Sequence, residues 1–505
     1  MGSDRMLCWG LGAVVLTAAG VMLAAFAAFV ADDAFIVGRY SRNAAEGLGL
    51  VYNEGERVSA LTSPLHALFM TVLAQVSDDP VALYRSLAPA ITALGLGGAL
   101  FIARTGLPAS VLVLAFALGS PFTVLWSVGG LETPVLFALI ALYAAILVRI
   151  WTEDAATDRQ VFALAILCGL AFLTRFDSLL VTLPPMLALA AVSLRRPAVW
   201  LGAVLALGIA GAWLAFAWGY YGDILPTSAY VKLSSGSAPG IKSLFTALNF
   251  LLVTGLVLLW PLGKRRDASG GLGRALRVGV AISAILFFLY ALQTSGKHMM
   301  FGYRAFVPYL PALGFILALR LEGRHLVAAL LVLGINAAVA YSMTRTGMNV
   351  ALLKSLPGIG MVTLEEATTT PTEYRTFIDI TEARAGQVAA HWAATGQGGT
   401  PRIFLYTGGS GYWLRDFYVF ETLISYRHRC ADARRMVAAS HYVQNIPSVP
   451  VNDAMQARIR DRADVGGAVT WVPGGDPLPR IRFAYGPSPQ DIVFLPSKTR
   501  GSCRG

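Results

Sequence analysis

Residues 30–64 read "VADDAFIVGRYSRNAAEGLGLVYNEGERVSALTSP" and directly follow an apolar run at residues 7–30. An α-helix needs roughly 20 apolar residues to cross a bilayer, and this run is long enough. It is too long for the core of a signal peptide, and more apolar segments follow it, so we interpret it as a retained first transmembrane helix. Two adjacent carboxylates, Asp32 and Asp33, therefore stand where the chain leaves the bilayer.

The composition of the whole chain is typical of an integral membrane protein. Of the 505 residues, 56% are hydrophobic and only 14% are charged, whereas ordinary soluble domains carry about 25% charged residues. Apolar segments fill residues 7–342, and the remainder of the chain is more polar. The sequence therefore predicts an all-α polytopic membrane bundle at residues 1–342 and a smaller, soluble α/β domain at residues 343–505.

Eleven apolar segments have the composition expected of transmembrane helices. They lie at residues 8–30, 84–103, 108–126, 132–150, 160–174, 178–194, 198–219, 243–261, 275–293, 305–319 and 326–342. A further apolar run, residues 65–76, is too short for a full crossing and predicts a helix at the membrane interface. The sequence thus predicts about eleven transmembrane helices.

Basic residues in the short loops set the orientation, because cytosolic loops of membrane proteins carry an excess of Lys and Arg. If the short run at residues 65–76 does not cross, ten of them fall on one side of the predicted bundle, and if it does cross they change sides. They are Arg104, Arg149, Arg159, Arg195, Arg196, Lys264, Arg265, Arg266, Arg320 and Arg324. If this side is cytosolic, the loops on the opposite side are residues 31–83, 127–131, 175–177, 220–242 and 294–304. The C-terminal domain is then extracytoplasmic as well.

The net charge and the cysteines exclude several classes of function. The formal net charge of +11 does not indicate nucleic acid as a partner, because short cytosolic loops explain it. Of the four cysteines, Cys430 and Cys503 lie in the tail, and no CxxC or Cys/His spacing of a zinc site is present. We therefore predict no metal site and no cofactor. An oxidising compartment would permit a Cys430–Cys503 disulfide.

The tail has the pattern of a small α/β domain. Residues 402–406 (RIFLY), 468–473 (AVTWVP) and 491–496 (DIVFLP) are short strand-like runs, separated by turns rich in Gly and Pro. Residues 381–394 (TEARAGQVAAHWAA) predict an amphipathic helix.

The carboxylate pair at residues 32–33 is the first candidate for a catalytic group. Adjacent carboxylates repel each other, and partial burial raises a carboxyl pKa, so one of the two could accept a proton from a substrate. The alternative is a solvated helix terminus, where acidic residues are common. Residues further along the same loop favour a site, since they add charge and hydrogen-bonding groups: Arg39, Tyr52, Asn53 and Glu56.

Basic residues from several outer loops accompany these carboxylates. A carboxylate base among cations fits an anionic lipid substrate whose leaving group is a phosphate, and arginine suits bidentate phosphate binding. Arg175, Lys232, His298 and Arg304 are the candidates for holding that phosphate. The alternative for each is contact with lipid headgroups. That alternative fits Arg175 poorly, because the sequence LTRFD lies tightly between two apolar runs.

Five motifs occur in the order in which a known family carries them. After the first loop come SVGGLETPV (127–135), LTRFDSLL (173–180), GYYGDILPTSAYVK (219–232) and SGKHMMFGYRAFVPYLP (295–311). The chain resembles the polytopic GT-C glycosyltransferases that use polyprenyl-phosphate sugars. Within that class it is most similar to the mycobacterial-type terminal β-(1→2)-arabinofuranosyltransferases. The resemblance covers residues 1 to about 345.

The resemblance implies a site and a function. It implies that Asp32 or Asp33 is the catalytic carboxylate. It also implies that the donor and acceptor are bound by Glu132, Arg175, Asp177, Tyr221, Lys232 and Arg304. The chain departs from the family at Lys297, where an acidic residue is common, and at His66, where Trp is common. His66 is retained as a candidate binding residue.

The function that this resemblance implies is transfer of a sugar, arabinofuranose in the family, from a polyprenyl-phosphate donor such as decaprenyl-phosphoryl arabinose. The acceptor would be an extracytoplasmic glycan of the bacterial cell wall, and the enzyme would be a multi-pass protein of the inner (plasma) membrane. Two alternatives remain open. One is transfer of another lipid-linked sugar to a lipid, O-antigen or protein acceptor, and the other is transport of the lipid-linked sugar by a flippase.

Overall fold

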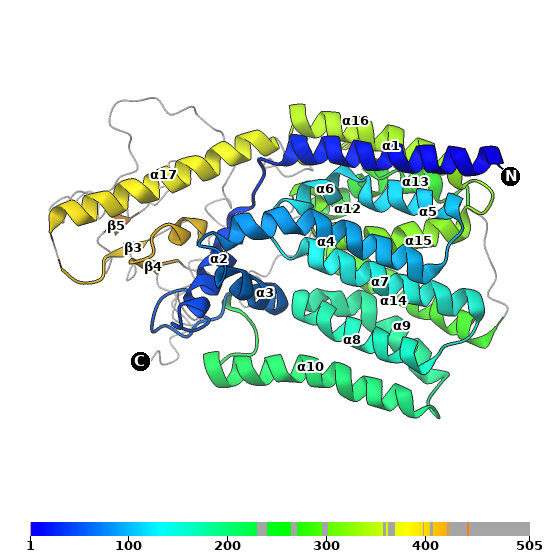
Figure 1. The fold of residues 1–505 in the computed structure, drawn as a ribbon, viewed down its shortest axis with the longest axis horizontal. Coiled ribbons are helices and arrows are strands. Elements are labelled where there is room, and N and C mark those ends of the chain that lie inside the picture. Colours follow the sequence, from blue (N-terminus) through cyan, green and yellow to red (C-terminus); the bar gives the residue numbers. More distant parts are fainter. Residues whose placement is uncertain are drawn as a thin grey trace.

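The computed structural model describes residues 2–229, 240–263, 270–294, 301–356, 360–361, 369–396, 398–404, 408–421, 424 and 442–443. Its helices run side by side along the long axis of the molecule (Figure 1). The described part of the C-terminal tail lies at one end of this bundle, beside the end of the first helix (Figure 1). The candidate site is built at that end.

Six described helices are long and apolar enough to cross a membrane. They are α1 (Gly2–Phe26), α4 (Pro80–Ala103), α7 (Thr133–Glu153), α10 (Pro197–Tyr221), α14 (Gly271–Thr294) and α16 (His325–Arg345). If a bent pair is counted as one span, it adds a seventh; its two helices lie before and after Gly119 and meet at 59°. That pair consists of α5 (Leu107–Val113) with the π-helix η1 (Leu114–Leu118), followed by α6 (Pro121–Ser127). The chain is a multi-pass membrane protein.

The remaining predicted spans are helical but shorter. They form α8 (Asp158–Thr174), η2 (Phe176–Ser178) with α9 (Leu179–Ala191), α12 (Ile241–Val253) with α13 (Leu256–Leu259), and η4 (Val307–Tyr309) with α15 (Leu310–Arg320). Because a perpendicular crossing needs roughly 20 helical residues, the structure does not confirm the predicted count of eleven. The short run at residues 65–76 forms α3 (Pro64–Ala74), whose 11 residues agree with the prediction that it does not cross.

Small residues let the bundle helices approach closely. A Cβ atom at Gly95 of α4 would lie 2.7 Å from the Cα of Ala138 in α7. Close backbone approach of this kind is how membrane helices gain packing energy where no hydrophobic effect drives association. Large buried rings fill the rest of the interior, among them Trp126, Phe122 and Phe137. The α4–α7 pair therefore forms a rigid support for the loop that precedes α7.

The described tail contains one long helix and two small sheets. Helix α17 (Pro371–Thr395) begins with a capping box of Thr370 and Glu373 and includes the predicted helix at residues 381–394. Strands β4 (Tyr418–Phe420), β3 (Arg402–Phe404) and β5 (Tyr442–Val443) form a parallel sheet in that order. Strands β1 (Ser355–Leu356) and β2 (Gly360–Met361) pair antiparallel.

Some predictions for the tail fall outside the described residues. The predicted strands at residues 468–473 and 491–496 and the Cys430–Cys503 pair are among them. The strand predicted at residues 402–406 is present as β3. The division of the chain into domains at residues 342 and 343 stays a prediction.

Arg39 joins the first loop to the tail. It lies on α2 (Asp32–Ala45), which packs against the 3-10 turn η6 (Gly408–Tyr412) of the tail. Its buried guanidinium donates to the carbonyl oxygens of Tyr52 (2.7 Å), Leu414 (2.8 Å), Phe417 (2.7 Å) and Gly411. The contacts are main-chain carbonyls from two segments more than 350 residues apart, so Arg39 fastens α2 to the tail.

We expect Arg39→Met to lower the thermal stability of the purified protein strongly. The change keeps much of the side-chain volume but leaves several buried carbonyls without a donor, at about 1–3 kcal/mol each. The matched control is Arg415→Met, since Arg415 is half exposed and its closest carboxylate contact, with Glu46, is 3.7 Å long. Thermal unfolding in detergent measures both. Equal midpoints for Arg39→Met and Arg415→Met would contradict this role.

Candidate active site

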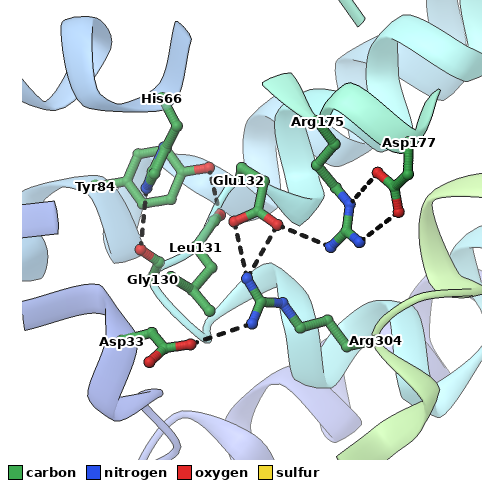
Figure 2. Close-up of polar contacts among 9 residues, drawn as sticks. All are labelled: Asp33, His66, Tyr84, Gly130, Leu131, Glu132, Arg175, Asp177 and Arg304. Atoms are coloured by element: carbon green, nitrogen blue, oxygen red, sulfur yellow. Dashed lines mark hydrogen bonds and ion pairs between the residues drawn. The ribbon is translucent and has the colours of Figure 1, made fainter. Parts of the chain in front are cut away.

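Five ionisable side chains form a continuous series of ion pairs (Figure 2). The series lies at the end of the bundle that contacts the C-terminal tail. Arg304 lies between Asp33 (3.4 Å) and Glu132 (3.0 Å), and Glu132 also pairs with Arg175 at 3.2 Å. Arg175 in turn forms two parallel hydrogen bonds with Asp177, of 3.0 and 2.7 Å. The structure thus brings together five predicted site residues that lie far apart in the sequence.

Glu132 is the centre of this network. Its side chain is 2% exposed, and it precedes the first residue of α7. Burial alone would raise its carboxyl pKa, but the charges of Arg304 and Arg175 outweigh burial and lower the pKa to about 2. Glu132 therefore stays ionised at neutral pH and holds two guanidiniums close to each other.

Hydrogen bonds fix the loop that carries Glu132. The Ala31 N–H donates to the Gly129 carbonyl at 2.9 Å, which ties this loop to the residue just before Asp32. The Tyr84 hydroxyl donates to the Leu131 carbonyl at 3.0 Å, and Arg85 Nε donates to the Val128 carbonyl at 2.8 Å. Helix α4 therefore holds the loop that carries Glu132, and the Ala31–Gly129 bond joins this loop to the start of α2. Figure 2 shows the bond from Tyr84.

The two arginines of the network differ in their free donors. The guanidinium of Arg175 is occupied on both sides, by Asp177 and by Glu132. Arg304 donates twice to Glu132 through Nη2, but its bond to Asp33 is long at 3.4 Å, and its buried Nε has no partner among the described residues. Arg304 is therefore the cation with donors left for a ligand.

The two aspartates also differ. The Asp33 side chain is 37% exposed and faces Arg304. Asp32 is buried, and its Oδ1 has no hydrogen-bond partner in the described part of the chain. Burial, together with the charge of Asp33, raises the pKa of Asp32 to about 7, although a hydrogen bond from the Gly409 main chain opposes the shift. Asp32 can therefore exchange a proton near neutral pH, and its catalytic role stays a prediction.

His66 lies behind the loop rather than in the line of charges. Its Nε2 donates to the Gly130 carbonyl at 3.3 Å, and its ring meets the Tyr84 ring edge to face at 4.6 Å (Figure 2). Burial lowers the pKa of His66 to about 4, so the ring is neutral at pH 7. Its Nδ1 has no partner among the described residues.

No protein-family model matches the chain. The terminal β-(1→2)-arabinofuranosyltransferase of Corynebacterium glutamicum is 28% identical over 327 residues, which cover 54% of this chain and 45% of that enzyme. The enzyme of the same name from Mycobacterium tuberculosis is 32% identical over 261 residues, 46% of this chain and 40% of that enzyme. The chain is similar to the terminal β-(1→2)-arabinofuranosyltransferases.

This similarity confirms the resemblance that the five motifs predict. The chain spans less than half the length of these two arabinofuranosyltransferases. Among solved structures, the crystal structure of ArnT from Cupriavidus metallidurans bound to undecaprenyl phosphate aligns at a TM-score of 0.48. That alignment has 16% sequence identity and covers 81% of this chain and 75% of ArnT.

A second group of predicted residues lies against the tail instead of the network. The Asn53 side chain pairs with both main-chain groups of Val419 in β4, at 2.9 and 3.0 Å, and donates to Glu56 at 2.8 Å. Burial raises the pKa of Glu56 to about 7. The ring of Tyr52 lies 4.8 Å from the guanidinium of Arg39. These residues form the interface between the first loop and the tail.

The last predicted residues lie elsewhere. The Tyr221 hydroxyl, at the end of α10, donates to the Leu50 carbonyl at 2.7 Å and so holds the first loop against that helix. Lys232 and His298 lie outside the described residues, as does Lys297. Within the described ranges, no group of three or more His, Cys, Asp or Glu side chains has the arrangement of a metal site.

Sequence reasoning missed the residues that position the site. Tyr84 and Arg85 sit within a predicted span, and their bonds to loop carbonyls leave no sequence pattern. A charged Arg85 at the start of an apolar helix was the available signal, because ionisable groups near membrane depth are costly. Tyr374 and Gly409 of the tail contact Asp32. The only sequence signal for these contacts was the glycine-rich sequence TGGSG (407–411), which contains Gly409.

Proposed function

We propose that the protein is a membrane glycosyltransferase that moves a sugar from a polyprenyl-phosphate donor to an extracytoplasmic glycan acceptor. Arabinofuranose is the sugar proposed, because both curated relatives are named for transferring it. The observation that carries the proposal is the position of Arg304 beside the carboxylate pair Asp32–Asp33. Arg304 has an unused N–H donor, and the pKa of Asp32 is about 7.

The proposed chemistry uses the carboxylates and Arg304 in separate roles. One aspartate accepts the proton of an acceptor hydroxyl as its oxygen forms a bond to the anomeric carbon. The bond between that carbon and the phosphate oxygen breaks, and the polyprenyl phosphate leaves. Arg304 is proposed to bind the departing phosphate, which matches the fork of a guanidinium. Asp32 is the stronger candidate for the base, because its pKa of about 7 lies near ambient pH.

Lys232 and His298 are included in the proposal because the charge of a bound phosphate must be balanced. The network contains three carboxylates and two guanidiniums, so an added phosphate dianion or monoanion needs further cations nearby. Lys232 and His298 are proposed to supply them from loops on the same side of the membrane. Glu132 and the Arg175–Asp177 pair are proposed to hold Arg304 in place rather than to touch the donor.

We place the site and the tail on the extracytoplasmic side of the inner membrane. Asp33, Glu132, Arg175 and Arg304 meet at one end of the bundle. The basic residues after α4, near the end of α7 and before α10 lie at the opposite ends of these helices. The positive-inside rule assigns that other side to the cytosol.

Arg304→Ala is expected to reduce use of the donor by about 10- to 150-fold, since a hydrogen bond to a charged group is worth ~1.5–3 kcal/mol. Arg304→Lys should recover part of the loss, because it keeps the charge but not the fork. Donor titration at saturating acceptor in proteoliposomes gives kcat and the apparent KM. The control is Arg375→Ala, an exposed residue of α17 that pairs with Asp379 on the same helix.

Unchanged kcat and unchanged donor KM in Arg304→Ala would remove Arg304 from the donor site. Arg175→Ala separates the two roles proposed for the arginines. Because its donors are already occupied, we expect Arg175→Ala to lower the thermal stability of the protein as well as the rate.

A further inference from the structure

A turn of the tail touches the proposed base directly. Gly409, in η6, lies against the side chain and main chain of Asp32, although the two residues are more than 370 positions apart in the sequence. The Gly409 main chain lies close enough to the Asp32 carboxylate to oppose the rise in its pKa. Both residues are buried, so this contact is shielded from solvent.

The contact is possible only for glycine. A Cβ atom at position 409 would lie 2.8 Å from the carbonyl oxygen of Asp32 and closer still to its Oδ1. The carbonyl oxygen is main chain, so it cannot move aside as the end of a flexible side chain does. A substituent at 409 must therefore displace α2 at its first residue or push the turn away from it.

Helix α17 of the tail holds the same aspartate from a second direction. The Asp32 N–H donates to the Tyr374 hydroxyl at 3.4 Å. The Tyr374 ring is buried and packs edge to face against Phe29, with ring centroids 5.5 Å apart. Phe29 belongs to the segment that connects α1 to α2, so Tyr374 contacts this connection at Phe29 and the first residue of α2 at Asp32.

We propose that the tail turn Gly408–Tyr412 is a positioning element of the active site, with Gly409 as the residue that holds the Asp32 carboxylate in its reactive place. This inference rests on the proposed function, in which Asp32 is the base. It makes the soluble tail a working part of the membrane site rather than a separate acceptor-binding module. Among the further contacts of the turn are the bond from Arg39 to the Gly411 carbonyl and the stacking of the Arg42 guanidinium on the Tyr412 ring.

The test compares Gly409→Ala with Gly386→Ala in the full chain in proteoliposomes. Gly386 is an exposed glycine of α17, and a Cβ atom added there would meet nothing within 4 Å, so its substitution probes the tail without touching Asp32. We expect Gly409→Ala to lower kcat by about 10- to 100-fold with little change in donor KM, because a small misplacement of a reacting group has an effect of this order. Gly386→Ala should retain the wild-type kcat.

A double variant separates positioning from a loss of folding. If Gly409 acts through Asp32, adding Gly409→Ala to Asp32→Asn should reduce the residual rate no further, since the effects of groups that act as a unit do not add. A general loss of structure would instead multiply the two effects and lower the thermal midpoint. A third comparison is Tyr374→Phe, which removes the hydroxyl but keeps the ring, and which we expect to lower kcat less than Gly409→Ala.

The outcomes distinguish this inference from the function on which it rests. Wild-type kcat in Gly409→Ala, together with a large loss in Asp32→Asn, would overturn the positioning role and leave the proposed function intact. Multiplicative effects in the double variant would also overturn it. Wild-type turnover in Asp32→Asn would instead remove Asp32 as the base, and the inference with it.

Discussion

Asp32→Asn and Asp33→Asn should each reduce transfer from a polyprenyl-phosphate sugar, and the variant of the true base should lose about 10²–10⁴ in rate, the usual contribution of a general base. Initial rates of sugar transfer in proteoliposomes give the measurement. Both changes are isosteric. Asn at position 32 also copies the protonated carboxyl that burial favours, so the Asp32→Asn protein should fold normally.

The pH dependence of the rate distinguishes the two aspartates. The pKa of Asp32 is raised from 3.8 to about 7, and a base works only when deprotonated. If Asp32 is the base, kcat/KM should rise with pH up to about 7 and then level off. The free energy of unfolding should change in the opposite direction. Because the folded state binds the Asp32 proton more tightly than the unfolded state does, the contribution of Asp32 to this free energy falls as pH rises from about 4 to about 7.

Asp32→Asn should remove this fall in stability, whereas Asp33→Asn should retain only the part of it that burial of Asp32 causes. Near-normal turnover in both single variants and in the double variant would contradict the assignment of the catalytic pair.

Glu132→Ala should have the second largest effect, on stability. The Glu132 carboxylate separates the guanidiniums of Arg304 and Arg175, whose side chains are 12% and 15% exposed. Removing it leaves two cations close together without the charge between them, and breaking a buried ion pair from one side costs about 3–5 kcal/mol. We expect a low yield of folded protein, and a clearly lower thermal midpoint for the fraction that folds.

Glu132→Gln and a control at the opposite end of α7 refine this test. Glu132→Gln keeps a hydrogen-bond acceptor but loses the charge, so its midpoint should lie between those of the wild type and Glu132→Ala. The control is Glu153→Gln, because Glu153 ends α7 in an exposed pair with Arg149, at 2.8 Å, on the same helix. Exposed pairs of this spacing contribute about 0.3–0.5 kcal/mol. If Glu132→Gln and Glu153→Gln unfold at the same temperature, the network does not stabilise the fold.

The sequence predicts the position of the helices and the members of the charge network for a physical reason. Hydropathy locates the helices, because a bilayer demands long apolar stretches. Alternation of the loops then assigns Asp33, Glu132, Arg175 and Arg304 to one side, and the structure joins these residues by ion pairs. The number of crossings could not be predicted as well, because several apolar segments form helices shorter than a full span.

The roles within the site were beyond sequence reasoning. Arg39 was predicted to bind a ligand because it is a cation beside two acids, whereas its guanidinium is occupied by carbonyls of the first loop and the tail. Every residue has a main-chain carbonyl oxygen, so the sequence does not mark which of them will accept a hydrogen bond from Arg39. The same holds for Gly409, whose importance comes from the atoms of Asp32 that surround it.

The most direct test of the central claim follows a labelled sugar through one reaction. The purified full chain is reconstituted in vesicles with a polyprenyl-phosphoryl arabinofuranose that carries the label in the sugar, and an arabinan oligosaccharide is added as acceptor. The account predicts that the label moves to the acceptor, that free polyprenyl phosphate accumulates in equal amount, and that Asp32→Asn slows both by about 10²–10⁴. A label that stays on its lipid while it crosses the bilayer, in the wild type and in Asp32→Asn alike, would show a transporter and contradict the account.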